Sequence, residues 1–170
     1  SDPAVSVIGS DRQLEIINLV SSCAGPLGMV GGQSLDMEME QQEFPFSTLE
    51  QIHRSKTGAL IRGSVLAGAI GAGCDGEQKK ALEQYGVKIG LAFQIVDDLL
   101  NATATTKQLG KAAGSDAEKG KATYPAYFGI DETRKMAAST VNEAVDSLAD
   151  FDERAEPLRE LARYIYTRSN

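Results

Sequence analysis

Apolar residues recur every three or four positions through most of the chain, and only an α-helix gathers that spacing onto one face. The clearest example is the segment 77–101, whose apolar stripe comprises Leu82, Tyr85, Ile89, Ala92, Val96 and Leu99. No segment of convincing length alternates apolar and polar residues with the period of two that a half-buried β-strand needs. The sequence of 170 residues therefore predicts an all-α fold with the length of one domain.

Local signals indicate where the predicted helices begin and end. Asp11 is a candidate N-cap, Ser47–Glu50 has the S-x-x-E pattern of a capping box, and Pro157 suits a first helical turn. The predicted helical segments run from Asp11 to about Ala24, over 33–42, from 47 to about 70, and over 77–101, 131–149 and 157–168. The segment 102–124 lacks periodicity, and a connection of that length is usually functional or disordered.

Charge and cysteine content exclude several classes of protein. Lys and Arg total 17 against 24 Asp and Glu, which gives a net charge of −7. This balance disfavours non-specific binding to nucleic acid or to anionic membranes, because both are polyanions. Cys23 and Cys74 form no C-x-x-C pair, so neither a zinc ribbon nor a disulfide framework is expected. We find no signal peptide and no run of about 18 apolar residues, so a cytoplasmic protein without a membrane span is expected.

Two glycine-rich segments imitate nucleotide-binding motifs. Gly71–Gly76 matches G-x-G-x-x-G, but it ends a predicted helix, and Leu91 stands where the acidic residue of a dinucleotide fold would follow. In Gly114–Lys121 the spacing between glycines is one residue too long for a phosphate-binding P-loop, and Ala122 replaces the hydroxyl residue. We interpret the first segment as the end of a helix, and we conclude that the second segment is not a P-loop.

The face of segment 77–101 opposite its apolar stripe predicts a cation site. At 100° per residue this face comprises Gly86, Gly90, Gln94, Asp97, Asp98 and Asn101. Asp97 and Asp98 lie within an otherwise apolar run, where two carboxylates are costly unless their charge is compensated. Mg²⁺ compensates such charge with one or two carboxylates, phosphate oxygens and water. The alternative is a pair of helix-end or surface acids without a metal.

Four motifs in a fixed order give the chain a family resemblance. They are Gly31-Gly32-Gln33-Ser34-Leu35-Asp36, Lys56-Thr57-Gly58, Phe93-Gln94-Ile95-Val96-Asp97-Asp98, and the loop from Gly110-Lys111 through Gly120-Lys121-Ala122-Thr123-Tyr124-Pro125. From about residue 11 to its end, the chain resembles the trans-prenyl diphosphate synthases, in particular bacterial farnesyl and geranylgeranyl diphosphate synthases (geranyltranstransferases). The resemblance implies an all-α isoprenoid-synthase bundle around a central cavity, usually as a homodimer. It also implies condensation of isopentenyl diphosphate with an allylic diphosphate, assisted by Mg²⁺.

The resemblance implies a role for each matching residue. Asp97, Asp98 and Asn101 correspond to the second aspartate-rich motif, which holds magnesium. Lys56, Lys111 and Lys121 match positions that bind the allylic diphosphate, and Asp116 matches an acidic loop position beside it. Thr57 and Gln94 match residues whose oxygens lie near the developing carbocation. Gln33 and Asp36 match cavity-lining positions; Phe93 joins the substrate-binding set, although packing in the core is its alternative.

The sequence departs from the family pattern in two places. Asn101 replaces the last aspartate of D-D-x-x-D, so weaker binding of the cation is expected. The first aspartate-rich motif does not occur, because Asp97-Asp98 is the only pair of adjacent aspartates. Residues 1–170 are therefore expected to be the C-terminal portion of one synthase domain, inactive on its own. A non-catalytic partner subunit of a complete synthase is the alternative; a class I terpene cyclase fits the glycine-lysine loop less well. Product chain length is not determined by this sequence.

Overall fold

The computed structural model describes residues 8–103 and 122–168, and no strand is present in that part of the chain. Its α-helices are α1 (Ser10–Ala24), α2 (Met29–Glu38), α3 (Phe46–His53), α4 (Ala59–Ala72), α5 (Gly76–Thr103), α8 (Tyr124–Phe128), α9 (Ile130–Asp146) and α10 (Glu156–Thr167). A π-helical segment, η2 (Arg54–Gly58), joins α3 to α4, and a 3-10 turn, η3 (Glu153–Ala155), precedes α10. The predicted all-α fold is confirmed.

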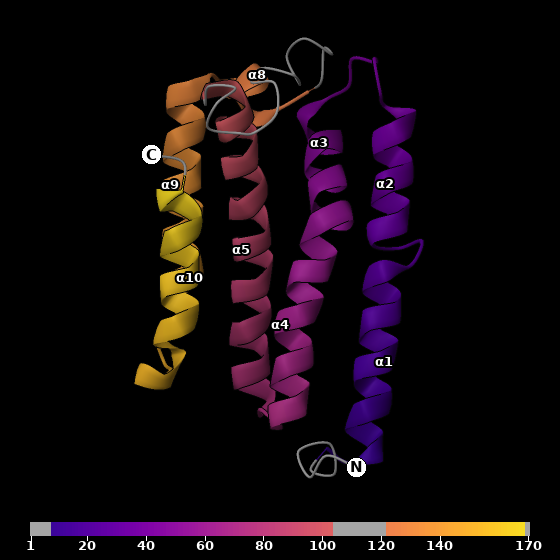
Figure 1. Ribbon diagram of the computed structural model, residues 1–170, viewed down its shortest axis with the longest axis vertical. Coiled ribbons are helices and arrows are strands. Elements are labelled where there is room, and N and C mark those ends of the chain that lie inside the picture. The colour runs from indigo at the N-terminus through magenta and orange to yellow at the C-terminus, as the bar shows by residue number, and fades with distance from the viewer. Residues whose placement is uncertain (1–7, 104–121, 169–170) are drawn as a thin grey trace.

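The long helices lie side by side in a layer (Figure 1). At one edge α1 and α2 follow each other almost end to end; α3 and α4 form the next column, and α5 follows. At the other edge α9 and α10 pack against α5 and against each other. The order of the columns places α4 between α1 and α5, and places α5 between α4 and α9.

Helix α5 contributes more core side chains than its neighbours because its predicted apolar stripe is buried. The six residues of that stripe are all at most 8% exposed, and Tyr85, Ala92 and Val96 are fully buried. Tyr85 also donates a hydrogen bond of 2.7 Å from its hydroxyl to the carbonyl of Leu158 in α10. The stripe therefore performs the packing role that its helical spacing predicts.

Two glycines on the opposite face of α5 let the neighbouring column approach closely. A Cβ on Gly86 would lie 3.0 Å from the Cα of Arg62, and a Cβ on Gly90 would lie 3.1 Å from the Cα of Gly58. The small side chains of Gly86 and Gly90 predicted that another group could lie close to this face of the helix. The structure shows that α4 and η2 do so, because small residues bring two helix backbones together.

Three predicted helix starts differ from the observed ones. α1 begins at Ser10 after Gly9, so Asp11 lies in the first turn; an acid there favours the helix macrodipole but does not mark the boundary. α2 begins at Met29 rather than at residue 33. The predicted capping box is wrong: α3 starts at Phe46 after Pro45, and no side chain caps it. The fixed φ of Pro45, −68°, suits a helix start at the following residue.

The predicted helix from 47 to about 70 runs through α3, η2 and α4, but it contains a π-helical turn. The short α8 begins at the last residue of the stretch 102–124 and was not predicted, because five residues are too few for a periodic signal. Other boundaries are confirmed within a few residues: α5, α9 and α10 match their predicted segments, and Pro157 lies in the first turn of α10. The glycine-rich Gly71–Gly76 does end a helix, because Gly73 adopts a left-handed φ of 74° as the C-cap of α4.

One stretch of the described residues, Ser10–Glu38, is by length and composition apolar enough to cross a membrane, and 11% of its most apolar part is buried. In the structure it is not one helix, because α1 ends at Ala24 and α2 begins at Met29. It also packs within the layer: a Cβ on Gly63 of α4 would lie 2.7 Å from Sγ of Cys23. The absence of a membrane span remains a prediction.

Candidate functional site

The predicted residues Lys56 and Asp36 form an ion pair. Nζ of Lys56 donates to Oδ2 of Asp36 over 2.7 Å, and their side chains are 34% and 20% exposed. The pair joins α2 to η2 through two residues that are twenty positions apart in sequence. Because both side chains keep some exposure, a second anion can still reach the ammonium group.

Gly32 makes this pair geometrically feasible. A Cβ at Gly32 would lie 2.3 Å from the backbone nitrogen of Lys56 and 2.7 Å from its Cα. The backbones of α2 and η2 are therefore in direct contact, and Asp36 lies one helical turn beyond this contact. Gly32 was not among the predicted site residues; its place in the Gly31-Gly32-Gln33 motif was the available signal.

The π-helical turn contains both Lys56 and Thr57. Such turns insert an extra residue into a helix and are frequent at functional sites. Here η2 redirects the helix between α3 and α4, while Thr57 remains half-buried. On α2, Gln33 is exposed. These two residues lie on the same neighbouring elements, η2 and α2, as the ion pair.

The last turns of α5 carry the predicted metal ligands in different environments. Asp98 is 8% exposed and Asn101 is 7% exposed, whereas Asp97 is half-buried. Oδ2 of Asp98 accepts a hydrogen bond of 2.9 Å from the backbone N–H of Tyr124, the first residue of α8. Within residues 8–103 and 122–168, the Asp97 carboxylate has no hydrogen-bond or ion-pair partner. Gln94 is half-buried and shares one face of α5 with Asp97 and Asn101.

The donor set at this end of α5 fits magnesium in chemistry but is incomplete. Carboxylate and amide oxygens are ligands that Mg²⁺ accepts, together with phosphate oxygens and water. Among the described residues, no group of three His, Cys, Asp or Glu side chains is arranged to hold a metal ion. A cation here would need further ligands, such as diphosphate oxygens.

Tyr124, which the sequence analysis did not select, is central to this end of the molecule. Its ring stacks on His53 with the centroids 5.7 Å apart, and Phe46 packs edge-on at 5.0 Å. Burial raises the pKa of the Tyr124 hydroxyl well above its usual value; the negative charges of Glu50 and Asp98 raise it further, and Arg54 lowers it. His53, the only histidine of the chain, is buried in this aromatic contact.

Phe93 has a packing partner on the C-terminal side of α10. The guanidinium carbon of Arg168 lies 4.3 Å from the centroid of the Phe93 ring, and Nη2 of Arg168 donates to the Phe93 carbonyl over 3.5 Å. This contact ties the end of the described chain to α5 one turn before Asp97. The predicted Lys111, Asp116 and Lys121 lie outside the described residues.

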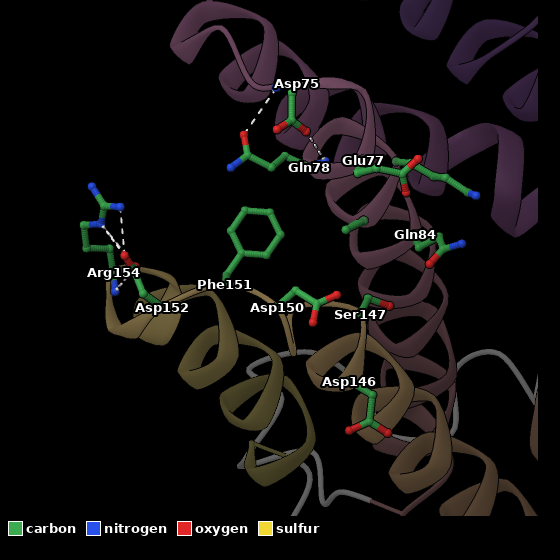
Figure 2. Close-up of a pocket in the computed structure, with 12 residues that line it drawn as sticks. Asp75, Glu77, Gln78, Gln84, Asp146, Ser147, Asp150, Phe151, Asp152 and Arg154 are labelled. Carbon is green, nitrogen blue, oxygen red and sulfur yellow. Dashed lines mark hydrogen bonds and ion pairs between the residues drawn. The ribbon is translucent and has the colours of Figure 1, made fainter.

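Two of the cavities are lined by none of the predicted site residues. Figure 2 shows a groove of about 530 Å³ between the start of α5 and the connection from α9 to α10, lined largely by acidic and polar side chains. Asp75 there caps α5 by accepting the N–H of Gln78, and Asp152 pairs with Arg154. This groove is about 30 Å along α5 from Asp97, at 1.5 Å per residue. A second cavity of about 420 Å³ runs beside η2 and is lined in part by Arg54, Arg62 and Leu91.

Comparisons with known proteins identify a family and several relatives. The family model described as polyprenyl synthetase matches residues 4–162. A dimethylallyltranstransferase of Fischerella ambigua is 44% identical, over 96% of this chain and 47% of its own length. A farnesyl diphosphate synthase of Escherichia coli is 40% identical, over 99% of this chain and 58% of its own length.

A solved structure extends the likeness to three dimensions. The geranyltransferase of Helicobacter pylori, complexed with magnesium and isoprenyl diphosphate, superposes with a TM-score of 0.78 at 27% identity. The superposition covers 95% of this chain and 53% of that one. The chain thus spans about half the length of the curated relatives it matches.

Proposed function

Because the chain belongs to the polyprenyl synthetase family, we propose that the protein containing it is a prenyltransferase. It would condense isopentenyl diphosphate with an allylic diphosphate to make farnesyl or geranylgeranyl diphosphate. The observation that carries this proposal is the Lys56–Asp36 pair, which holds a partly exposed lysine side chain beside the helix that carries Gln33. Residues 1–170 would be the C-terminal portion of a single synthase domain, in keeping with their coverage of the relatives.

Each residue has a task in this reaction. Ionisation of an allylic diphosphate separates a carbocation from a polyanion, so the leaving group must be neutralised in place. Lys56 would supply a fixed positive charge, with Lys111 and Lys121 as further cationic contacts and Asp116 beside them by sequence correspondence. The oxygens of Thr57 and Gln94 would stabilise the cation, while Gln33, Asp36 and Phe93 would line the substrate cavity.

Magnesium is proposed at the end of α5, toward Asp97, Asp98 and Asn101. Bound there with the diphosphate, it would act as a Lewis acid that neutralises the leaving group. The Asp97 carboxylate supports this assignment, because it is half-buried and has no hydrogen-bond or ion-pair partner among the residues that the structure describes. The Helicobacter pylori relative, which binds magnesium and isoprenyl diphosphate, supports the same pairing of metal and substrate.

A homodimer in the cytoplasm is part of the proposal. Large apolar side chains remain exposed along α1, α2 and their connection, namely Leu14, Ile17, Val20, Leu27, Val30 and Met37. Exposed apolar side chains gathered on neighbouring elements favour an interaction site, because large apolar patches are rarely left open to water. A second copy of the chain that pairs the same surface would cover it.

The decisive experiment places this chain after the N-terminal part of the Escherichia coli relative, so that a full-length synthase results. We expect this fusion to elongate an allylic diphosphate in the presence of Mg²⁺. We expect Asp97→Asn or Lys56→Met in the fusion to lower turnover about a hundredfold, because each removes charge that stabilises the departing diphosphate. Lys135→Met, on the exposed face of α9, serves as the control with unchanged turnover.

The isolated chain distinguishes the proposal from its alternative. We expect no chain elongation from residues 1–170 alone. If a folded fusion is also inactive, while added chain changes the product pattern of a complete synthase, the non-catalytic partner subunit replaces the proposal. Normal turnover by the fusion carrying Asp97→Asn would refute the assigned metal role.

A further inference from the structure

Asp97 and Asp98 are adjacent in sequence but face different surroundings. Side chains of consecutive helical residues diverge by about 100°. Asp97 has no described partner, whereas Asp98 is 8% exposed and accepts the backbone N–H of Tyr124 over 2.9 Å. The hydrogen bond joins residues 26 positions apart and lies in the interior. The two carboxylates therefore do not form one equivalent pair.

The segment that Asp98 contacts depends on such anchors. α8 has five residues, far fewer than an isolated helix needs for stability in water. Its N–H groups are unpaired within the helix at its start, so outside acceptors must satisfy them. The Thr123 side chain accepts the N–H of Ala126 over 3.4 Å, and Asp98 accepts the N–H of Tyr124.

Side chains then fix α8 against α3. The Tyr124 ring lies between His53 and Phe46, and the hydroxyl of Tyr127 donates to the carbonyl of Phe44. These contacts place α8 beside α3, and α8 also packs against α5 and α9. Within residues 8–103 and 122–168, the Asp98 carboxylate forms the side-chain hydrogen bond that ties the backbone of α8 to the end of α5.

From this geometry we infer that Asp98 is a positioning residue. Its carboxylate anchors the start of α8 on the end of α5. Asp97 is then the carboxylate of the pair that is directed to a cation. Only this last statement rests on the proposed function; the anchoring role rests on the hydrogen bond itself.

Hydrogen exchange tests the anchor without any metal. In the complete 170-residue chain, in metal-free buffer, we expect Asp98→Ala to speed exchange of the Tyr124 amide about tenfold or more. Asp98→Asn keeps an acceptor oxygen in the same place, so it should restore protection to within about threefold of the original chain. Asp97→Asn is the matched control, and it should leave the exchange rate of the Tyr124 amide unchanged. In every variant, the exchange rate of the Ala137 amide in α9 should also stay unchanged.

A cation measurement tests the division of roles. With Mn²⁺ as the probe, we expect Asp97→Asn to weaken binding about tenfold and Asp98→Asn less than about threefold. If the original chain binds no Mn²⁺, even with pyrophosphate present, the proposed metal role of Asp97 is wrong. The exchange result still decides whether Asp98 anchors α8. If Asp98→Asn weakens Mn²⁺ binding as much as Asp97→Asn, the division of roles is overturned.

The exchange experiment remains decisive even if the Asp98→Ala variant does not fold. If Asp98→Ala unfolds the chain, Asp98→Ser takes its place, because its hydroxyl is one bond shorter and does not reach the Tyr124 amide. Fast exchange in Asp98→Ser with protection in Asp98→Asn supports the anchor. Equal protection of the Tyr124 amide in all folded variants overturns it.

Discussion

The ammonium group of Lys56 contacts the carboxylate of Asp36 over 2.7 Å, and this contact bridges α2 and the π-helical turn η2. Because both side chains are partly exposed to water, the pair can contribute to binding without contributing much to folding stability. Ion pairs that keep solvent exposure contribute little to folding, since water screens them and side-chain entropy opposes them. Here the side chains are 34% and 20% exposed. The pair is thus suited to orienting Lys56 while leaving it open to an anion.

The first prediction follows from this separation. We expect Lys56→Met to change the free energy of unfolding by less than about 1 kcal/mol, because the pair is partly solvated. In the presence of Mg²⁺, the same variant should bind pyrophosphate at least about tenfold more weakly, because a fixed cationic donor is lost. Urea denaturation and calorimetric titration measure the two quantities. A matched control is Lys135→Met, whose partner Glu132 lies on the same exposed helix face; equal losses in both variants would contradict a specific role for Lys56.

The second prediction concerns the close contact between α2 and η2. A Cβ at Gly32 would lie 2.3 Å from the backbone nitrogen of Lys56, so Gly32→Ala must displace one element. We expect a loss of about 1–3 kcal/mol of stability, the usual cost of overpacking. In contrast, a Cβ at Gly68 meets nothing within 4 Å, so Gly68→Ala should stabilise α4 by about 0.5–1 kcal/mol. Thermal and urea unfolding of both variants compare these effects directly, and a neutral Gly32→Ala would contradict the backbone contact.

Local periodicity was enough to predict the helices and the core of α5. Tyr85, Ala92 and Val96 are buried as their three- and four-residue spacing predicts, because a helix converts that spacing into one face. The same information did not determine exact starts. α3 begins at Phe46, one residue before the predicted capping box, because the fixed φ of Pro45 can replace a side-chain cap.

Contacts between distant segments could not be predicted from local signals. Gly32 and Lys56 touch through their backbones, and Asp98 reaches Tyr124 across 26 positions of sequence. Each contact depends on how two helices pack, which a periodic pattern does not specify. The family resemblance selected Asp98 and Lys56 as functional positions. Its loop motif also contained Tyr124 but assigned it no role, and the importance of this residue lies in its contacts with Asp98, His53 and Phe46.

The third prediction concerns the amide in the second aspartate-rich motif. Asn101 is 7% exposed, so Asn101→Asp places a further carboxylate in a buried position near Asp98. Without metal we expect a loss of about 1–3 kcal/mol, because burying a second carboxylate close to Asp98 costs desolvation energy and adds repulsion between like charges. With saturating Mg²⁺ and pyrophosphate, the variant should gain more thermal stability than the original chain, because an anionic ligand replaces a neutral one. Thermal unfolding with and without these ligands measures both effects; identical ligand-induced shifts would show that position 101 does not contact the cation.

The fourth prediction tests the exposed apolar surface of α1 and α2. The Ile17 side chain is 59% exposed and Leu14 lies one turn before it with the same exposure. If a second copy covers this surface, Ile17→Glu should shift the equilibrium toward the monomer at least about tenfold, since an unpaired charge would be buried. Leu161→Glu on α10, also exposed, is the control that should leave association unchanged. Analytical ultracentrifugation gives the dissociation constants, and dimers of equal affinity in both variants would exclude α1 from the interface.

The fifth prediction concerns stability at alkaline pH. Burial raises the pKa of Tyr85 from its usual 10 to about 12. Below pH 10 the hydroxyl is protonated in both folded and unfolded chains, so its contribution to stability is complete. Between pH 10 and 12 the unfolded chain releases the proton while the folded chain retains it. Stability should therefore fall by up to about 1.4 kcal/mol per pH unit from this residue.

Removal of the hydroxyl separates this effect from packing. Tyr85→Phe also removes the 2.7 Å hydrogen bond to the Leu158 carbonyl, so it should cost about 1 kcal/mol at neutral pH. Between pH 10 and 12 its stability should fall less steeply than that of the original chain, because Tyr85 no longer titrates. Tyr164→Phe, at an exposed position, should leave the slope unchanged. Urea unfolding at pH 7, 10 and 11 supplies the comparison; parallel curves for Tyr85→Phe and the original chain would show that Tyr85 does not cause the alkaline loss.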